Sequence, residues 1–296
     1  MTRASYSWGL YPKKPQVVHS CSWESDLPAV KRLLSDKYKS FLPFGNGRSY
    51  GDSCLAESSH VLSIRNMDRF IYFDWQRGIV RAEAGVSLAE ILAITIPQGW
   101  FLSVTPGTQY ATLGGAIAND VHGKNHHLRG TFGRHVVSFG LLRNGGEIVV
   151  CSPLQQTDLY AATIGGLGLT GVIVWAEIQL IKIVTAEIDT TVVRFNNLSE
   201  FFLLSAELDS KHEYSVAWID CLAKGSEVGR GVYIVGDHSR YGRAEILSSS
   251  KVGVPIAPPF SLVNNMSLKV FNNLYWHCHP SNSTRSRTSY EPFFYP

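Results

Sequence analysis

Short apolar runs separated by polar turns predict alternating strands and helices along residues 1–183. Residues 26–39 carry apolar side chains at helical spacing, which predicts a helix. Ser87, followed three residues later by Glu90, forms a capping-box pattern and predicts a second helix that ends near Pro97. Further segments have strand or helix periodicity: strands over 41–44, 61–64, 70–74, 79–84, 136–142, 147–151 and 171–183, and a helix over 157–164.

The pattern changes after residue 183. Residues 187–195 alternate apolar and polar positions as a strand does, and residues 198–208 have the apolar stripe of a helix. Two more strands are expected over 214–219 and 231–235, whereas the polar residues 281–289 are expected to be loose. We therefore expect one domain over residues 1–183, a second over 184–296, and an α+β fold without the regular alternation of a doubly wound sheet.

Composition restricts the class of protein. The chain has 296 residues, of which 45% are hydrophobic, enough to bury a core and to exclude a wholly disordered chain. A net charge of +3 does not indicate nucleic acid as a partner. No run of about 18 uncharged apolar residues predicts a spanning helix, although peripheral membrane contact stays open. Five scattered cysteines and no visible secretory signal favour the cytoplasm.

Glycine-rich segments are the main chemical feature. They are GNGRSYG at 45–51, PGT at 106–108 with TLGGAIAN at 112–119, HGKNHH at 122–127 with GTFG at 130–133, and GGLGLTG at 165–171. Glycine loops let backbone amides approach a phosphate closely, although each segment alone is also typical of an ordinary turn or a tight helix contact. The first segment, GNGRSYG, departs from the dinucleotide fingerprint because its third glycine comes one residue late. Together they predict an elongated, phosphate-containing cofactor.

In this order and spacing, GNGRSYGD, PGT, TLGGAIANDVHGKNHH, GTFG and GGLGLTG resemble the PCMH-type FAD-binding domain of the vanillyl-alcohol oxidase class. Within that class they look most like the decaprenylphosphoryl-ribose 2′-oxidases, a group that SWG at 7–9 and SVAW at 215–218 also fit. The resemblance implies a FAD-binding domain of two α/β subdomains, followed by an incomplete, mostly antiparallel substrate domain. The family's catalytic base falls beyond Pro296, so no residue here is assigned that role.

The resemblance also implies which residues bind FAD. They are Pro43, Phe44, Gly45, Asn46, Gly47, Arg48, Ser49, Tyr50, Gly51, Asp52, Ser53, Gly107, Thr108, Thr112, Leu113, Gly114, Gly115, Asn119, Asp120, Val121, His122 and Ile173. The pyrophosphate is expected on the loop 43–53. Relatives that attach FAD covalently have a histidine at the position of Arg48, so non-covalent FAD is expected; the alternative role for Arg48 is a surface salt bridge.

His122, Lys124 and Trp218 are expected to face the flavin or the substrate, with Asp220 beside Trp218. A cation near the pyrimidine end of the flavin would stabilise its anionic reduced form. The alternatives are a histidine bonded to the backbone and a tryptophan in the core.

Two histidine groups invite a metal interpretation, namely His122 with His126 and the segment His277, Cys278, His279. Zinc sites need three or four convergent ligands, and nothing in the sequence joins the two groups. We therefore predict no metal site.

The activity implied by the resemblance is oxidation of a secondary sugar alcohol to a ketone, with hydride passing to flavin N5. The preferred substrate is a polyprenyl-phosphate ribose, an arabinosyl-donor precursor, at the inner face of a membrane. A short-chain reductase would be the partner for the second half of the epimerisation. Two alternatives stay open: an aldonolactone or alditol oxidase of the D-arabinono-1,4-lactone oxidase type that uses oxygen, and a non-catalytic FAD-binding module.

Overall fold

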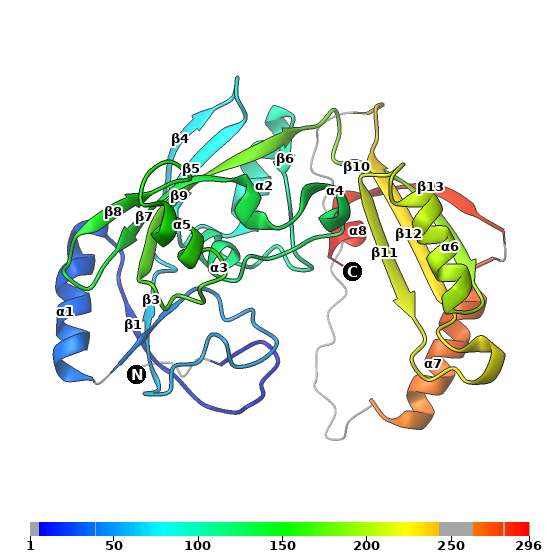
Figure 1. The fold of residues 1–296 in the computed structure, drawn as a ribbon, viewed down its shortest axis with the longest axis horizontal. Coiled ribbons are helices and arrows are strands. Elements are labelled where there is room, and N and C mark those ends of the chain that lie inside the picture. The colour runs from blue at the N-terminus through cyan, green and yellow to red at the C-terminus, as the bar shows by residue number, and fades with distance from the viewer. Residues whose placement is uncertain (1–5, 39, 243–262, 281, 296) are drawn as a thin grey trace. The chain divides into compact units, whose positions relative to one another are not determined.

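The computed structural model describes residues 6–38, 40–242, 263–280 and 282–295 (Figure 1). The chain divides into two compact units. The first is Met1–Ile183 together with Tyr295, and the second is Val184–Phe294 together with Pro296. Helices and strands occur in both units, which confirms the predicted α+β class.

A parallel three-stranded sheet, in the order β1-β3-β2, begins the first unit. Its strands are β1 (Val17–Ser20), β2 (Leu42–Phe44) and β3 (His60–Ser63). A short 3-10 helix (Glu24–Asp26) leads into α1 (Leu27–Lys37). Phe44, Ala56 and Val61 form the core of this subdomain, against which Leu42 packs. β2 ends at the buried residue Phe44, and the first glycine-rich loop begins at the next residue.

A six-stranded antiparallel sheet forms the second subdomain of this unit, in the order β4-β5-β9-β7-β8, with β6 also paired to β9. Its strands are β4 (Phe70–Asp74), β5 (Ile79–Glu83), β6 (Trp100–Leu102), β7 (Val136–Leu142), β8 (Ile148–Cys151) and β9 (Val172–Lys182). The first five residues of β9 are all buried, so both faces of the sheet are covered there.

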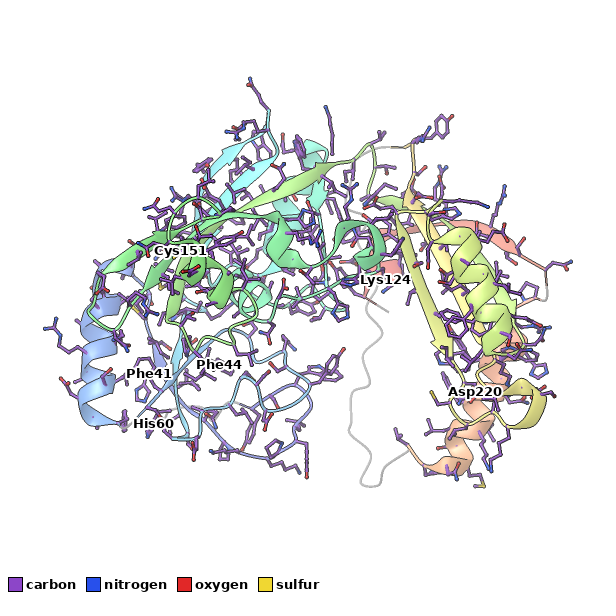
Figure 2. The ribbon with its side chains drawn as sticks, in the orientation of Figure 1. Phe41, Phe44, His60, Lys124, Cys151 and Asp220 are labelled. Atoms are coloured by element: carbon purple, nitrogen blue, oxygen red, sulfur yellow. The ribbon has the colours of Figure 1, made fainter. Side chains whose placement is uncertain are left out.

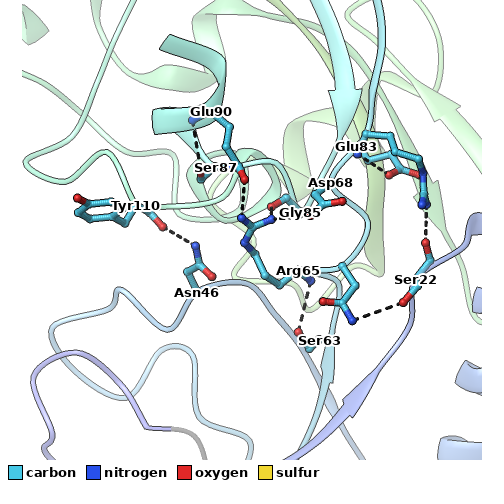
Figure 3. A network of polar contacts seen from close by, with 12 residues as sticks. Ser22, Asn46, Ser63, Arg65, Asp68, Glu83, Gly85, Ser87, Glu90 and Tyr110 are labelled. Atoms are coloured by element: carbon cyan, nitrogen blue, oxygen red, sulfur yellow. Dashed lines mark hydrogen bonds and ion pairs between the residues drawn. The ribbon is translucent and has the colours of Figure 1, made fainter. Parts of the chain in front are cut away.

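Short helices connect these strands. They are α2 (Leu88–Thr95), α3 (Leu113–Ala118), α4 (His126–Arg129) and α5 (Thr157–Thr163), with 3-10 turns at Ile96–Gln98 and Phe132–His135. The capping box predicted at the start of α2 is confirmed: the Ser87 hydroxyl accepts a hydrogen bond from Glu90 N–H, and Glu90 Oε2 accepts one from Ser87 N–H at 2.7 Å. Arg65 also donates to Glu90 Oε1, at 2.7 Å (Figure 3).

The second unit is built on a four-stranded antiparallel sheet in the order β11-β12-β10-β13. Its strands are β10 (Glu187–Phe195), β11 (Tyr214–Ile219), β12 (Gly231–His238) and β13 (Thr284–Ser289). Its helices are α6 (Leu198–Leu208), α7 (Asn265–Cys278) and α8 (Tyr290–Phe294), with a 3-10 turn at Gly225–Glu227. Phe201, Leu204 and Leu208 of α6 pack on Phe195 and Tyr233 of the sheet.

The expectation that residues 281–289 are loose was wrong. Residue 281 lies outside the described residues, and residues 284–289 form β13, an edge strand paired with β10. The pairing holds because polar side chains bond across it: Arg287 Nε donates to Asp189 Oδ1 at 2.7 Å, and the Thr190 and Ser286 hydroxyls lie 2.8 Å apart. In the described ranges, no helix has the length and apolar character needed to cross a membrane.

Candidate functional site

Glycine-rich segments that are far apart in the sequence meet around α3 in the first unit. A Cβ at Gly45 would collide with the side chain of Thr112, the N-cap of α3. In the segment 165–171, the N–H of Leu167 donates to the carbonyl of Ala118, the last residue of α3, at 2.8 Å. The structure therefore places the loop after β2, α3 and the loop before β9 against one another.

The loop after β2 has the properties that a phosphate group requires. Among the described residues, no backbone N–H of residues 45–48 or 50–53 donates a hydrogen bond to another protein group. A Cβ at Gly51 would meet no atom within 4 Å, and the same is true of Gly107 in the second segment. Backbone N–H groups without a protein partner can bind an anion. This arrangement fits the pyrophosphate of FAD.

Two side chains fasten this loop to the segment before α3. Asn46 Nδ2 donates to the backbone carbonyl of Tyr110 at 2.9 Å (Figure 3). The Arg48 guanidinium lies 5.3 Å from the centroid of the Tyr110 ring, a cation–π distance. Arg48 forms no ion pair with any described residue, so the salt-bridge alternative for it has no support. Tyr110 was not expected at this site, and no short-range pattern connects it with residues 64 positions earlier.

The backbone N–H groups of some predicted cofactor-binding residues donate hydrogen bonds to other protein groups. Leu113 N–H donates to Val86 O at 2.7 Å, and Gly114 N–H donates to Ala84 O at 2.8 Å. These bonds fix the first turn of α3 beside β5. Ile173 is only 5% exposed and lies in β9. Contact between these residues and FAD remains a prediction.

The segment that carries His122 and Lys124 follows α3 and is held by its own turn. Asp120 has a positive φ of 42°, and its Oδ1 accepts a hydrogen bond from Gly133 N–H at 2.8 Å. His122 is exposed and pairs with Thr131 through an isolated bridge. This brings the third glycine-rich segment, residues 130–133, against the end of α3.

Lys124 is half-buried beside α4 (Figure 2). Burial lowers the pKa of its ammonium group, because leaving water penalises the charged form. The next residue, Asn125, is buried and donates from Nδ2 to Ser103 O at 2.8 Å. Asn125 was not predicted as a site residue, although its position next to Lys124 within HGKNHH was a signal.

Trp218 and Asp220 belong to the second unit, and both make contacts within it. The Trp218 ring packs edge-on against Tyr275 of α7, with 4.7 Å between centroids. Asp220 is 3% exposed, bonded to Arg230 Nε at 3.2 Å and to Asn272 Nδ2 at 2.7 Å. Burial raises the pKa of Asp220, but its hydrogen bonds and Arg230 outweigh burial and hold it below the ordinary value. These contacts give Asp220 a structural role.

The histidines considered as metal ligands do not form a cluster. The rings of His122 and His126 lie 6.0 Å apart between centroids. His277 and His279 each bond through Nδ1 to a backbone carbonyl four residues earlier, at 2.8 Å. Across the ranges that the structure covers, no group of three or more His, Cys, Asp and Glu side chains is arranged to hold a metal ion.

Comparison with known proteins agrees with this geometry. Residues 15–152 match the sequence family described as FAD binding domain. The chain is 34% identical over 232 residues to decaprenylphosphoryl-beta-D-ribose oxidase of Mycolicibacterium smegmatis, a match that covers 77% of this chain and 50% of that protein. An uncharacterized protein in the mprA 5′ region of Streptomyces coelicolor is 38% identical over 154 residues, covering 52% of this chain and 41% of that one.

A third relative is more distant. D-arabinono-1,4-lactone oxidase of Eremothecium gossypii is 22% identical over 198 residues, which cover 64% of this chain and 36% of that protein. The chain thus spans about half the length, or less, of the curated relatives that it matches. The glycine-rich motifs lie mainly in the matched residues 15–152. This chain therefore carries an FAD-binding domain of the PCMH type.

Proposed function

We propose that this chain is an FAD-dependent oxidoreductase that oxidises a secondary alcohol of a polyprenyl-phosphate pentose. The observation that supports this substrate class is the extent of the 34% identity to decaprenylphosphoryl-beta-D-ribose oxidase. That match covers 232 residues, more than the 183 that precede the second unit, so it continues beyond the FAD-binding domain. Similarity in the second unit supports a similar substrate, because residues outside the cofactor loops select it.

The residues near α3 are suited to holding the cofactor. The N–H groups of residues 45–48 and 50–53 would bind the pyrophosphate, and the open space at Gly51 and Gly107 would admit it. FAD, when bound, supplies the acceptor for the hydride that leaves the carbinol carbon. The protein's task is to fix the position of that carbon and to keep water away from it.

Lys124 supplies a partly desolvated positive charge in this unit. A charge with little water around it acts strongly on a nearby anion, because the effective dielectric constant is lower than in water. We assign Lys124 to an anionic group of the bound cofactor or substrate. Arg48 cannot form the covalent flavin bond made by a histidine, so the proposed FAD is non-covalent.

The product of this oxidation is a ketone, and inversion of the carbon requires that this ketone is then reduced to the epimeric alcohol. A reductase must therefore consume the product, and a short-chain reductase is the partner that we propose. A lipid-linked substrate also places the reaction at a membrane surface.

An absorption spectrum of the purified 296-residue chain, taken before and after acid precipitation, tests the cofactor. We expect a flavin spectrum, with all the flavin in the supernatant after precipitation. Flavin in the pellet would overturn the non-covalent assignment. A folded protein that stays colourless in excess FAD would overturn the proposed function.

Anaerobic reduction tests the substrate class. A short-chain polyprenyl-phosphoryl ribose should bleach the flavin, whereas free arabinono-1,4-lactone should not. Rapid bleaching by the lactone, with hydrogen peroxide formed when air is admitted, would favour a lactone oxidase. Flavin that neither compound bleaches would contradict both activities.

A further inference from the structure

The turn that carries Lys124 is fixed on both sides by buried contacts. Asn125 is 1% exposed, and its Nδ2 donates to the backbone carbonyl of Ser103 at 2.8 Å. On the other side, Gly123 lies so close to Thr105 that a Cβ would be 2.5 Å from the Thr105 carbonyl oxygen. Lys124 therefore lies between two residues that are held against the same short backbone segment, 103–105.

That segment is itself anchored to the central strand of the six-stranded sheet. It follows β6, whose residues pair with β9. The Ser103 hydroxyl donates to the carbonyl of Gln179, in β9, at 2.7 Å. Ser103 is also buried. The support for Lys124 thus runs from β9 through Ser103 to Asn125 by two hydrogen bonds, of which the one between Asn125 and Ser103 is buried.

A lysine side chain has many rotamers, and ordering one costs conformational entropy. Lys124 is half-buried on a backbone that is held in place, which reduces the number of positions that its ammonium group can reach. Less entropy is therefore lost when an anion binds. We infer that Asn125 is a positioning residue, which through its bond to Ser103 holds Lys124 in place for an anionic group of the bound cofactor or substrate. This inference rests on the proposed function.

The N125L variant tests the inference, because leucine keeps the branched shape of the asparagine side chain but cannot donate to Ser103. The first readout needs no cofactor: the pH midpoint for acylation of Lys124 by an amine-reactive reagent, followed by mass spectrometry. We expect the midpoint to rise in N125L toward that of an ordinary exposed lysine, because the turn loosens and Lys124 reaches solvent.

Two further readouts identify the anion. If Lys124 serves the flavin, K124M and N125L should shift the flavin midpoint potential in the same direction. If it serves the substrate phosphate, both should raise KM for polyprenyl-phosphoryl ribose by several-fold at an unchanged potential. Either result supports the inference. A protein without flavin would defeat the proposed function, yet the acylation arm would still decide whether Asn125 positions Lys124.

The matched control is Q16L. Gln16 is also buried, and its Oε1 accepts a hydrogen bond from Ala56 N–H at 2.8 Å, in the three-stranded subdomain. Q16L should lower Tm and leave the acylation midpoint, the potential and KM unchanged. If N125L behaves like Q16L in all three readouts, Asn125 is merely structural and the inference is wrong. If N125L does not fold, N125A also removes the donor to the Ser103 carbonyl without adding volume, and unchanged readouts in that variant overturn the inference equally.

Discussion

The side chain of Thr112 occupies the space that a Cβ of Gly45 would need. The loop after β2 can therefore lie against α3 only because residue 45 has no side chain. We expect Gly45→Ala to cost about 1–3 kcal/mol of unfolding free energy, the usual cost of overpacking, and to reduce FAD binding because the loop is displaced. Urea denaturation and flavin stoichiometry measure the two effects.

Gly51 and Gly107 provide the opposite case, because a Cβ at either position meets no atom within 4 Å. Gly51→Ala and Gly107→Ala should change stability by less than about 1 kcal/mol. Both should nevertheless weaken FAD binding, since the added methyl enters space assigned to the cofactor. Wild-type affinity for FAD in both variants would show that the pyrophosphate lies elsewhere.

His238 makes the second unit sensitive to acid. It is enclosed by aromatic rings of Tyr214 and Phe294, with centroids 5.6 and 6.5 Å away. Burial lowers its pKa from 6.5 to about 4, although a hydrogen bond to the Thr185 carbonyl opposes the shift. The unfolded chain therefore takes up the proton first as pH falls below 6.5, so stability is complete above 6.5 and is lost toward pH 4.

The expected loss is up to about 3 kcal/mol, from the relation between a pKa shift and free energy. Denaturation curves at pH 7 and pH 4.5 measure it, and His238→Leu should remove most of the difference. The exposed His277 is the control, because His277→Gln should keep the wild-type pH dependence. Equal pH dependence in wild type and His238→Leu would contradict the assignment.

The pair of Asp220 and Arg230 ties α7 to the sheet of the second unit. Arg230 is also buried and lies over the Trp276 ring, 4.8 Å from its centroid. Arg230→Met leaves the Asp220 carboxylate buried without its partner, which typically costs about 3–5 kcal/mol. The double variant with Asp220→Leu should be less destabilised than the sum of the single variants. Flavin content per folded protein should stay at the wild-type value; a large loss in Asp220→Leu would instead indicate a functional role.

The sequence predicted those elements whose apolar positions recur regularly. β7, β9, β10 and α6 all carry such patterns, and the structure confirms them within a few residues. β13 was missed because its sequence, TRSRTS, contains no apolar residue and is stabilised by pairing with β10. Cross-strand hydrogen bonds of this kind leave no local pattern.

α3 was also not predicted as a helix. Its sequence, LGGAIA, contains two glycines, each of which disfavours a helix by about 1 kcal/mol. The buried side chains of Leu113 and Ile117 and the close approach of Gly114 to Ala84 outweigh that preference. Tertiary packing thus requires small residues where local propensity would exclude them.

The candidate site was predicted from motifs, and this explains what was found and what was missed. Glycine-rich runs identify the loops, because a close backbone approach restricts the residue type strongly. Asn125 lies within HGKNHH and Tyr110 between PGT and TLGGAIAN, but both act through hydrogen bonds to residues distant in sequence. Such partners are visible only when the chain is folded.

Asn46 gives a direct test of the link between the loop after β2 and Tyr110. Asn46→Ala removes the hydrogen bond to the Tyr110 carbonyl, and the loop then has to be ordered by the ligand itself. Losing one such bond costs about 1 kcal/mol, so the Kd for FAD should rise by about fivefold, as measured by quenching of FAD fluorescence. Asn66→Ala is the control, because Asn66 Nδ2 bonds to the Ser22 hydroxyl at 3.4 Å, away from the loop. An unchanged Kd in Asn46→Ala, or an equal rise in both variants, would show that this bond does not prepare the loop for the cofactor.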